Sequence, residues 1–599
     1  MTAQPQQPNH RKRQAHAGTK SVLRRRRAIE QEAAARTLSG NGRCPDLPPL
    51  PVGDGNDGGL GTLFGHPYGA LPHGNSLAHP DPNTSPDHVR SKGLGHLRPL
   101  NDEQILGVLS FFQGEDLARF VQCSRFSYVA GHHDELWRDL ALRNADVEKE
   151  GINFINRWRD TFVKQACKRR ALPSESFRSH TPMKVLSIYS DTFYRSWLCR
   201  SFHLNPSWLM TESVEREEAS SLTAERFVQE YEITNKPVIV SGATESWPAL
   251  SKWNRKYLIE KTRGVTFRAT SGAAPLTSTF TMESYARYCD GAVEEAPLYL
   301  FDRTFSKSVP HLLEDFVPAL KCTCPYLDPS APHGHDLFSL LGESRRPDYR
   351  WIIVGPKRSG SSFHIDPNCT HAWNVPVVGR KLWIFYPPGV NPPGVFPSAN
   401  GDDVAMPISI GEWFLTYWEE HCKRRDSPLT PQSERPLECT VSPGEILFVP
   451  HGWWHSVLNL DDGLSVALTQ NYVSSTNLGD VLRFLDSRIG QISGCRDRPE
   501  AISPADLGPE FRKALEKSRP DLLETGDKAA SAGWNCNAWI DEEQSKCRNK
   551  KAKSETTTSI LERAKMPGIR TENIEGEEKK DENSIGDGGT EVGFSFSFL

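Results

Sequence analysis

The middle of this 599-residue chain is a series of short apolar runs separated by turn residues. The runs are rich in β-branched and aromatic residues, with Gly, Pro or Asp near their ends, and they cover 237–240, 298–301, 350–354, 381–385, 446–449 and 464–468. Many short strands joined by turns predict an antiparallel barrel or sandwich. We therefore expect one β-domain over residues 219–480.

One segment inside this β-domain carries candidate metal ligands. In His364-Ile-Asp366 the two side chains are two residues apart, so on a strand they point to the same face. Neutral imidazole and carboxylate suit Fe(II) in a site of two histidines and one carboxylate. His455, at the start of a later run, is the expected third ligand. His451 competes with it, but its place beside Pro450 favours a loop.

The triplet His-x-Asp alone has little value, because it also occurs at 79–81 and at 132–134. The first copy lies in a region without regular periodicity, and the second lies in a helical segment where no strand can present it. Only the copy at 364–366 is flanked by strands and followed by a suitable histidine. We therefore expect the metal there.

A facial triad leaves three iron positions, which a bidentate 2-oxo acid and dioxygen can fill. The far carboxylate of such an acid needs a buried cation and hydroxyl groups. Lys381, in an apolar strand, is the natural counter-ion, although its neighbour Arg380 could equally be the residue that points inward. Thr469 and Asn471 share one strand face and could add a hydroxyl and an amide.

The two ends of the chain are polar and without period. Residues 1–92 predict a disordered, basic N-terminal region, and residues 521–599 predict a disordered tail. Two basic clusters, at 11–13 and 24–27, are either a bipartite nuclear import signal or a solvated tail. A nuclear location, with a cytoplasmic pool as the alternative, and nucleic-acid contact through the basic tails are the matching expectations.

Residues 93–145 predict a small all-α domain. Asn101 or Asp102 stands at a helix cap, and apolar residues follow at helical spacing from Ile105 to Phe112. Short segments at 116–117, 123–125 and 135–137 come next, and in order and spacing they resemble an F-box. The resemblance implies that residues 95–145 bind the Skp-type adaptor of a cullin-RING ubiquitin ligase. An ordinary helical bundle is the alternative.

The remaining segments are a helical and aromatic connector over 146–218 and C-terminal helices over 481–520. No run of about eighteen apolar residues exists, so no membrane span is expected. The formal net charge of −4 gives no global field that would attract nucleic acid or membrane.

The segments around both metal motifs, 349–381 and 443–471, resemble the JmjC hydroxylases once described as the phosphatidylserine receptor. The similarity runs from the 190s to the 470s. It implies an α+β chain with a double-stranded β-helix of the jelly-roll, or cupin, type and flanking helices. The implied iron ligands are His364, Asp366 and His455. The implied 2-oxoglutarate contacts are Lys381, Asn374, Thr469, Tyr299 and Ser361.

The resemblance also implies an activity: oxidation of a protein substrate by dioxygen, with Fe(II) and with 2-oxoglutarate as co-substrate. The reaction is expected to be side-chain hydroxylation, of lysine especially, or N-methyl demethylation, with histones among the candidate substrates. The alternative is an F-box adaptor whose barrel recognises a substrate without catalysis. An intact ligand triad favours the oxygenase.

Overall fold

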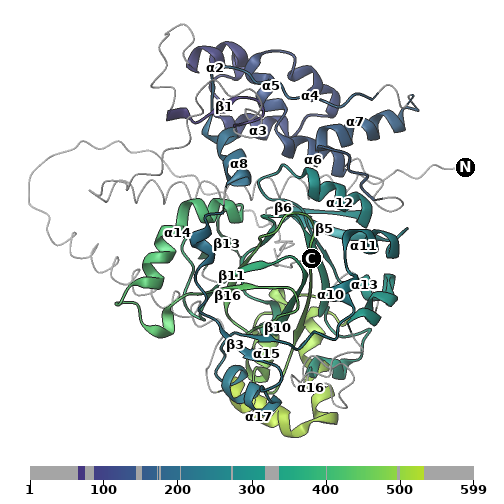
Figure 1. The fold of residues 1–599 in the computed structure, drawn as a ribbon, viewed down its shortest axis with the longest axis vertical. Helices are drawn as coiled ribbons and strands as arrows, with labels where there is room; N and C mark the ends of the chain where they lie inside the picture. Colours follow the sequence, from purple (N-terminus) through teal and green to yellow (C-terminus); the bar gives the residue numbers. More distant parts are fainter. Residues whose placement is uncertain are drawn as a thin grey trace, which may run out of the picture.

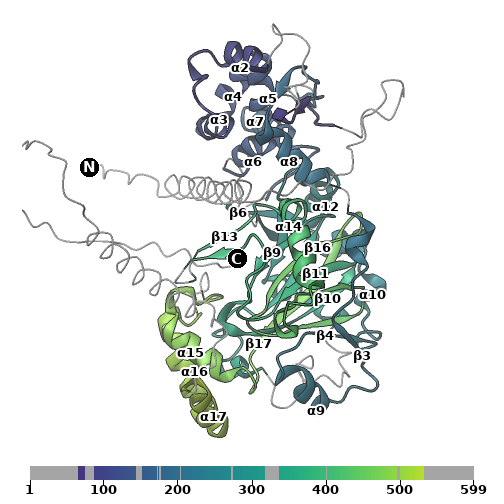
Figure 2. The ribbon, with the colours of Figure 1, turned by 90° about the vertical axis from the view of Figure 1, so that its left-hand side faces the viewer.

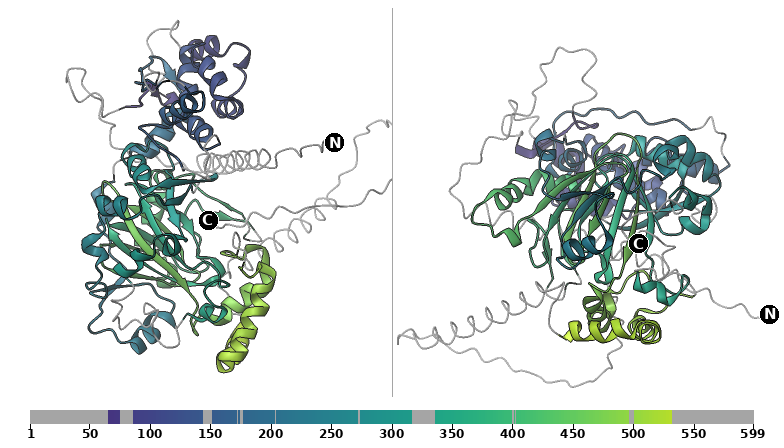
Figure 3. Two further views of the ribbon diagram at one scale, coloured as in Figure 1. Left: turned by 90° about the vertical axis from the view of Figure 1, so that its right-hand side faces the viewer. Right: turned by 60° about the horizontal axis from the view of Figure 1, so that its bottom comes forward.

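The structure is a computed structural model with three parts along its long axis (Figure 1). It describes residues 65–74, 86–143, 151–316, 336–495 and 500–531, apart from 172, 174–176, 203, 272–273, 399–400 and 402. Short helices lie at one end, a β-barrel lies in the middle, and the C-terminal helices lie at the other end (Figures 2 and 3). The basic clusters and the triplet at 79–81 lie outside the described residues.

Eight strands form two facing sheets. They are Arg350–Gly355 (β8), Gly360–His364 (β9), His371–Val378 (β10), Lys381–Tyr386 (β11), Leu437–Val441 (β14), Ile446–Val449 (β15), Trp454–Asn459 (β16) and Ser465–Tyr472 (β17). One sheet contains the order β15-β10-β17-β8 and the other is β14-β11-β16-β9. Apart from the step between β11 and β14, each strand passes to the opposite sheet from the one before it. This alternation confirms the expected double-stranded β-helix.

Five more strands extend the first sheet to nine, in the order β3-β4-β15-β10-β17-β8-β7-β5-β6. They are Glu215–Glu218 (β3), Val238–Ser241 (β4), Thr266–Ser271 (β5), Ala274–Thr281 (β6) and Tyr299–Asp302 (β7). The β3–β4 pair is parallel, so the sheet is mixed. A separate two-stranded pair joins Phe396–Pro397 (β12) to Val404–Ala405 (β13).

Helices cover the outside of the barrel. They are Ala224–Phe227 (α9), Ala249–Lys252 (α10), Arg255–Lys261 (α11), Met282–Gly291 (α12), Phe305–Ser308 (α13) and Ile410–Asp426 (α14). Leu382 and Ile384 of β11 pack against α14, whereas Trp383 and Phe385 lie in the apolar cluster between the two sheets. Because both faces of these strands are covered, their sequences are continuous apolar runs rather than alternating ones.

The N-terminal part is helical, as expected. Its helices are Pro86–Leu94 (α2), Asp102–Leu109 (α3), Gly114–Phe120 (α4), Arg125–Gly131 (α5), Asp134–Arg143 (α6) and Trp158–Arg169 (α7). Asn101 is the cap of α3, and it forms a capping box with Gln104. Leu109, Leu117 and Trp137 are buried in the core of this helical module.

The helical module is not packed independently of the barrel. Its core belongs to the same apolar cluster as Phe280 and Tyr288 of the barrel domain. Trp158 of α7 links the two parts, because it packs on Tyr288 and its indole N–H donates to Glu294. The connector also contains Ile188–Tyr189 (β2) and Asp191–Ser201 (α8).

Two predicted disordered regions are too long. Residues 86–92 belong to α2, and Ala70–Leu71 (β1) pairs with β2 in parallel. At the other end, Pro520–Ser531 (α17) continues the group formed by Leu478–Ser487 (α15) and Pro504–Ser518 (α16). Each of these segments is stabilised by distant partners, which local composition does not reveal. Among the helices of the described ranges, none is both long and apolar enough to cross a membrane.

Candidate metal centre

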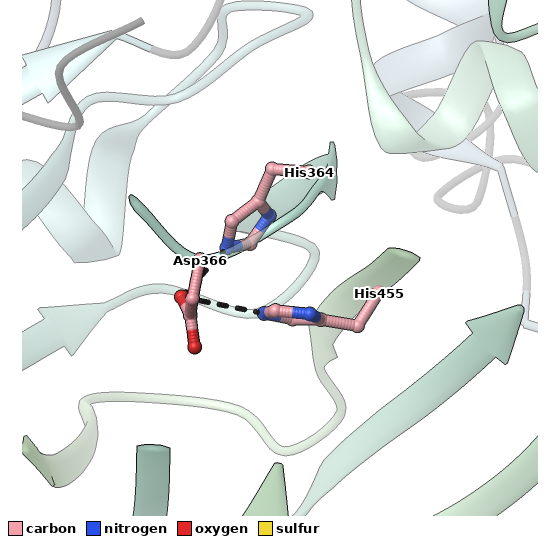
Figure 4. A group of neighbouring side chains, drawn as sticks. All are labelled: His364, Asp366 and His455. Carbon is pink, nitrogen blue, oxygen red and sulfur yellow. Dashed lines mark ion pairs between the residues drawn. The ribbon is translucent and has the colours of Figure 1, made fainter. Parts of the chain in front are cut away.

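Three side chains meet at one end of the barrel (Figure 4). His364 ends β9, Asp366 follows it, and His455 stands opposite His364 on the neighbouring strand β16. The pairing passes from His455 with His364 to Val457 with Ser361, so β9 carries one extra residue there. Such a bulge re-aims side chains, and it is common beside active sites.

The geometry of this group leaves room for an ion. The Nε2 atoms of His364 and His455 each lie 3.9 Å from Oδ1 of Asp366, and one ligand atom from each residue lies within 4.8 Å of the others. Nδ1 of His364 is 2.8 Å from the Ser362 carbonyl, and Nδ1 of His455 is 3.1 Å from the Trp453 carbonyl. Nδ1 must donate in both contacts, so each Nε2 presents a lone pair.

Burial sets the charge of these groups. It lowers the pKa of His364 to about 3 and that of His455 to about 4, so both imidazoles are neutral, as metal ligation requires. Burial also raises the pKa of Asp366 to about 6, and a bound cation would offset this cost. Two nitrogens and one carboxylate around a common point fit Fe(II).

A second layer of contacts supports Asp366. A hydrogen bond from Asn471 lowers the pKa of Asp366 and so partly offsets the rise that burial causes. The Asn471 amide also donates to Thr370 Oγ1 at 2.8 Å. Such partners fix the orientation of a metal ligand. His451 lies in the turn before β16 and contacts Asp480, so it is not part of the ligand group.

Lys381 points into the barrel and is almost fully buried. Its Nζ donates to Tyr299 Oη at 2.8 Å and to Asn459 Oδ1 at 2.9 Å, and within the described residues no carboxylate pairs with it. Burial lowers the pKa of Lys381 to about 7. Arg380 is half-exposed instead and pairs with Asp461 at 2.7 Å. The structure thus places Lys381, not Arg380, inside.

The other predicted contacts fall into two groups. Asn374 is buried, pairs in register with Thr469, and has an Oδ1 atom without a hydrogen-bond partner among the described residues. The Thr469 hydroxyl donates to the Trp373 carbonyl at 2.8 Å. Ser361 lies apart from Lys381, in a pocket beside His364. A buried cation with neutral partners fits a dicarboxylate such as 2-oxoglutarate, whereas the Asn374 Oδ1 atom is an acceptor and could not bind a carboxylate.

Sequence reasoning missed Asn459. This residue holds Lys381 from one side, and its amide donates to Ser359 Oγ at 2.9 Å. A signal was present, because Asn459 is four residues after His455 on one strand and therefore shares its face. It also pairs directly with Lys381 across β11 and β16.

Comparison with known proteins identifies the barrel. Residues 224–477 match the family described as the Cupin-like domain. The arginine-specific demethylase JMJ22 of Arabidopsis thaliana is 37% identical over 465 residues, which cover 77% of this chain and 84% of that protein. The chain belongs to the cupin-like JmjC family.

Two further relatives within the JmjC family carry informative names. The bifunctional arginine demethylase and lysyl-hydroxylase psr-1 of Caenorhabditis elegans is 33% identical, over 54% of this chain and 72% of that protein. The 2-oxoglutarate and iron-dependent oxygenase JMJD4 of Danio rerio is 33% identical, over 24% of this chain and 31% of that protein. Both metal motifs of this JmjC chain lie within the cupin-like match.

Proposed function

We propose that this JmjC protein is an Fe(II)- and 2-oxoglutarate-dependent oxygenase that acts on protein side chains. The observation that carries the proposal is the joint placement of two features in one barrel. The ligand group His364, Asp366 and His455 lies at one end of the β9–β16 pair. Lys381, which has no carboxylate partner among the described residues, lies farther along the same sheet. Relatives named as iron-dependent oxygenase, demethylase and hydroxylase support it.

Bound Fe(II) with 2-oxoglutarate supplies dioxygen activation: one oxygen atom leaves in succinate, formed with carbon dioxide, and the other enters a substrate C–H bond. The protein's own groups orient the reactants. His364, Asp366 and His455 would hold the metal, and Lys381 would bind the far carboxylate of 2-oxoglutarate. If the hydroxylated carbon is bonded to nitrogen, the product releases formaldehyde, which is demethylation.

The pocket beside the ligands supports one of the two expected substrates over the other. Its walls include Phe301, Phe338 and Trp351, and Phe301 and Trp351 lie 5.4 Å apart. Besides the ligand Asp366, the carboxylate among its described lining residues is Asp348, which already pairs with Arg303 at 2.5 Å. Aromatic walls suit a weakly hydrated, delocalised cation better than a bare ammonium group. We therefore place N-methylarginine demethylation ahead of lysine hydroxylation.

The test compares two synthetic peptides that differ only in a central dimethylarginine or lysine. With Fe(II), 2-oxoglutarate and dioxygen, we expect succinate and formaldehyde from the first and less succinate, without formaldehyde, from the second. Asp366→Ala serves as the metal-site control. Equal succinate production by the wild type and Asp366→Ala would refute the oxygenase, whereas preference for the lysine peptide would refute only the substrate order.

A second function is proposed for the helical module, as an F-box that binds a Skp-type adaptor through residues 95–145. Phe111, just after α3, is 61% exposed. An exposed aromatic side chain contributes little to the core of a small module, so Phe111 is a candidate contact for a partner. Leu109, in contrast, is 2% exposed and belongs to the core, so its replacement would disrupt folding rather than a contact. Leu109 is therefore not a suitable position at which to test the adaptor contact.

The adaptor test uses the full chain, because the module shares its core with the barrel. Phe111→Asp should end capture of a purified Skp-type adaptor, and Leu186→Asp, at a residue 79% exposed outside the module, should not. Capture that survives Phe111→Asp would argue against this surface. The described residues that line the pocket beside the metal ligands all lie between 301 and 494, outside residues 95–145. Adaptor binding and oxygenase activity can therefore coexist.

We also propose a nuclear location, supported by the basic clusters at 11–13 and 24–27, which lie outside the described residues. We propose nucleic-acid contact through the basic tails on the same support. Replacing all arginines and lysines of both clusters in a fluorescent fusion of the full chain should move it from the nucleus to the cytoplasm. If the fusion protein stays in the nucleus, the basic clusters do not direct its location, and they would no longer support the proposed nuclear location.

A further inference from the structure

Two groups of residues lie around the metal ligands. One is the buried group Lys381, Tyr299 and Asn459. The other lines a pocket and includes Ser361, His364, Asp366 and Trp351, and none of the three residues of the buried group is among its described lining residues. Tyr299 and Trp351 pack in one apolar cluster, so the two groups are neighbours. Because the buried group fits the co-substrate, we take the pocket as the route by which a substrate reaches the metal.

Trp351 has an unused hydrogen-bond donor. It lies on β8, is 6% exposed, and its Nε1 atom has no acceptor among the described residues. Buried indole N–H groups normally find a partner, because a buried donor without one destabilises the fold. Elsewhere in the described part of this chain the rule is followed by Trp137, Trp158, Trp253, Trp413 and Trp453.

Position distinguishes Trp351 from the other unpaired indoles. Trp247, Trp373 and Trp383 also have an Nε1 atom without an acceptor among the described residues. Trp247 and Trp373 belong to the large outer core, and Trp383 lies in the apolar cluster between the sheets. Of these four residues, Trp351 is the one that lines the pocket beside His364 and Asp366.

We propose that Trp351 determines how the substrate is positioned, with its indole N–H donating to a carbonyl oxygen of the bound peptide. The inference rests on the proposed function, because it takes the pocket as the substrate's path. The indole ring, tilted against Phe301 at 5.4 Å, forms the wall along which the target side chain passes. The N–H then fixes the peptide main chain relative to the metal, and among the described lining residues there is no second indole to replace it.

The test removes the donor and keeps the ring. Trp351→Phe is the simple variant, and replacement of Trp351 by benzothienylalanine keeps the bicyclic shape while sulfur takes the place of N–H. The probe is the dimethylarginine peptide, or the lysine peptide if the wild type prefers it. Both variants should raise KM for the peptide about three- to tenfold, the value of one hydrogen bond. They should also lower the yield of oxidised peptide per succinate.

A second readout separates the substrate from the co-substrate. The affinity of the Mn(II)-loaded protein for 2-oxoglutarate should not change in either variant. Trp247→Phe is the matched control, because it also removes an unpaired buried N–H, but in the outer core, and it should alter neither value.

Each outcome decides the proposal. Weaker 2-oxoglutarate binding in the Trp351 variants would mean that the acceptor is the co-substrate, and the proposal would be wrong. An unchanged peptide KM in the benzothienylalanine protein would also overturn it. If the wild type oxidises neither peptide, the proposed function itself fails, which is distinguishable because no variant is needed to see it.

Discussion

The described residues in and beside the barrel include two groups of two histidines and one aspartate, and of these two groups only one resembles a metal site. In the first group the rings of His364 and His455 lie 4.1 Å apart, beside Asp366. In the second, the rings of His371 and His451 lie 4.8 Å apart, and Asp480 contacts His451. Residue type, burial and proximity are therefore nearly the same in both groups.

The difference lies in how the nitrogens are used. In the second group His451 Nε2 is 3.2 Å from Asp480, His371 Nδ1 accepts the His451 main-chain N–H at 3.1 Å, and His371 Nε2 is 3.2 Å from Thr476 Oγ1. Direct hydrogen bonds hold the second group together. In the first group both Nε2 atoms lie 3.9 Å from one oxygen of Asp366, which is too far for a hydrogen bond. A metal site needs this shared gap.

The largest expected effect tests this difference directly. His364→Ala should abolish Fe(II) or Mn(II) binding, a loss greater than the roughly 10- to 100-fold cost of removing a second-layer contact. His371→Ala should leave the metal affinity within about twofold, because His371 offers no nitrogen to the metal. Titration of the metal-free proteins with Mn(II) measures both. Equal losses in the two variants would remove the distinction between the groups.

The two neighbouring cations on β11 also differ in whether their hydrogen-bonding groups are already paired with a charged partner. Lys381 faces neutral partners, whereas Arg380 already has its carboxylate. Removing one partner of a buried charged pair costs about 3–5 kcal/mol, and each factor of ten is about 1.4 kcal/mol. Lys381→Ala should therefore weaken 2-oxoglutarate binding by roughly two to three decades at constant metal affinity.

Two controls accompany this measurement by calorimetry on Mn(II)-loaded protein. Arg380→Ala should bind 2-oxoglutarate almost normally, because its side chain is half-exposed and outside the barrel. Lys381→Arg should recover little, because a planar fork does not fit where a compact ammonium group donates. A large loss in Arg380→Ala alone would show that the far carboxylate is held elsewhere.

The sequence predicted those features of the site that follow from strand alternation. Two-residue spacing brings Asp366 beside His364, because the backbone stays extended at Asp366 although β9 ends at His364. Alternation also separates Lys381 from Arg380 once either one is known to point inward. It could not decide between the two cations, because both faces of β11 are covered. It also could not predict the bulge in β9, or the contact of Asn459 with Lys381, since these depend on the pairing of β16 with two neighbours.

The fold shows the same limit. The apolar runs predicted the barrel because six of the strands, β4, β7, β8, β11, β15 and β17, each carry their own signal. The short strand β1 carries none: it is only Ala70–Leu71, and its partner β2 comes more than a hundred residues later. The helix α2 likewise lies in a segment whose composition suggested disorder, and it is stabilised by packing against α5 and the rest of the module.

A smaller effect concerns folding stability rather than metal binding. Here the aspartate of the second group, Asp480, should matter more than Asp366. Asp480→Ala removes a hydrogen bond to buried His451 and a favourable charge in the first turn of α15, and it should lower the free energy of unfolding by about 1–3 kcal/mol. Asp366→Ala should cost much less in the metal-free protein. Denaturant unfolding of both variants gives the comparison. A greater loss for Asp366→Ala would mean that the first group is structural too.

The smallest expected effect is a pH dependence of co-substrate binding. Burial lowers the pKa of Lys381 from 10.5 to about 7, so in the empty site the ammonium group loses its proton as the pH rises through 7. A bound carboxylate favours the charged form and raises this pKa. Binding above pH 7 must therefore take up a proton, and the Kd for 2-oxoglutarate should rise about tenfold per pH unit there.

Below pH 7 the lysine is already charged, so the Kd should be flat with respect to this group. Burial raises the pKa of Tyr299, the titratable partner of Lys381, far above this window, and Asn459 does not titrate. Calorimetry on Mn(II)-loaded protein between pH 6.5 and 8.5, in buffers of different ionisation enthalpy, would count the proton taken up. Lys381→Ala should lose both the proton uptake and the slope. A slope that persists in Lys381→Ala would assign the titration to another group, and Lys381 would then be charged before the co-substrate arrives.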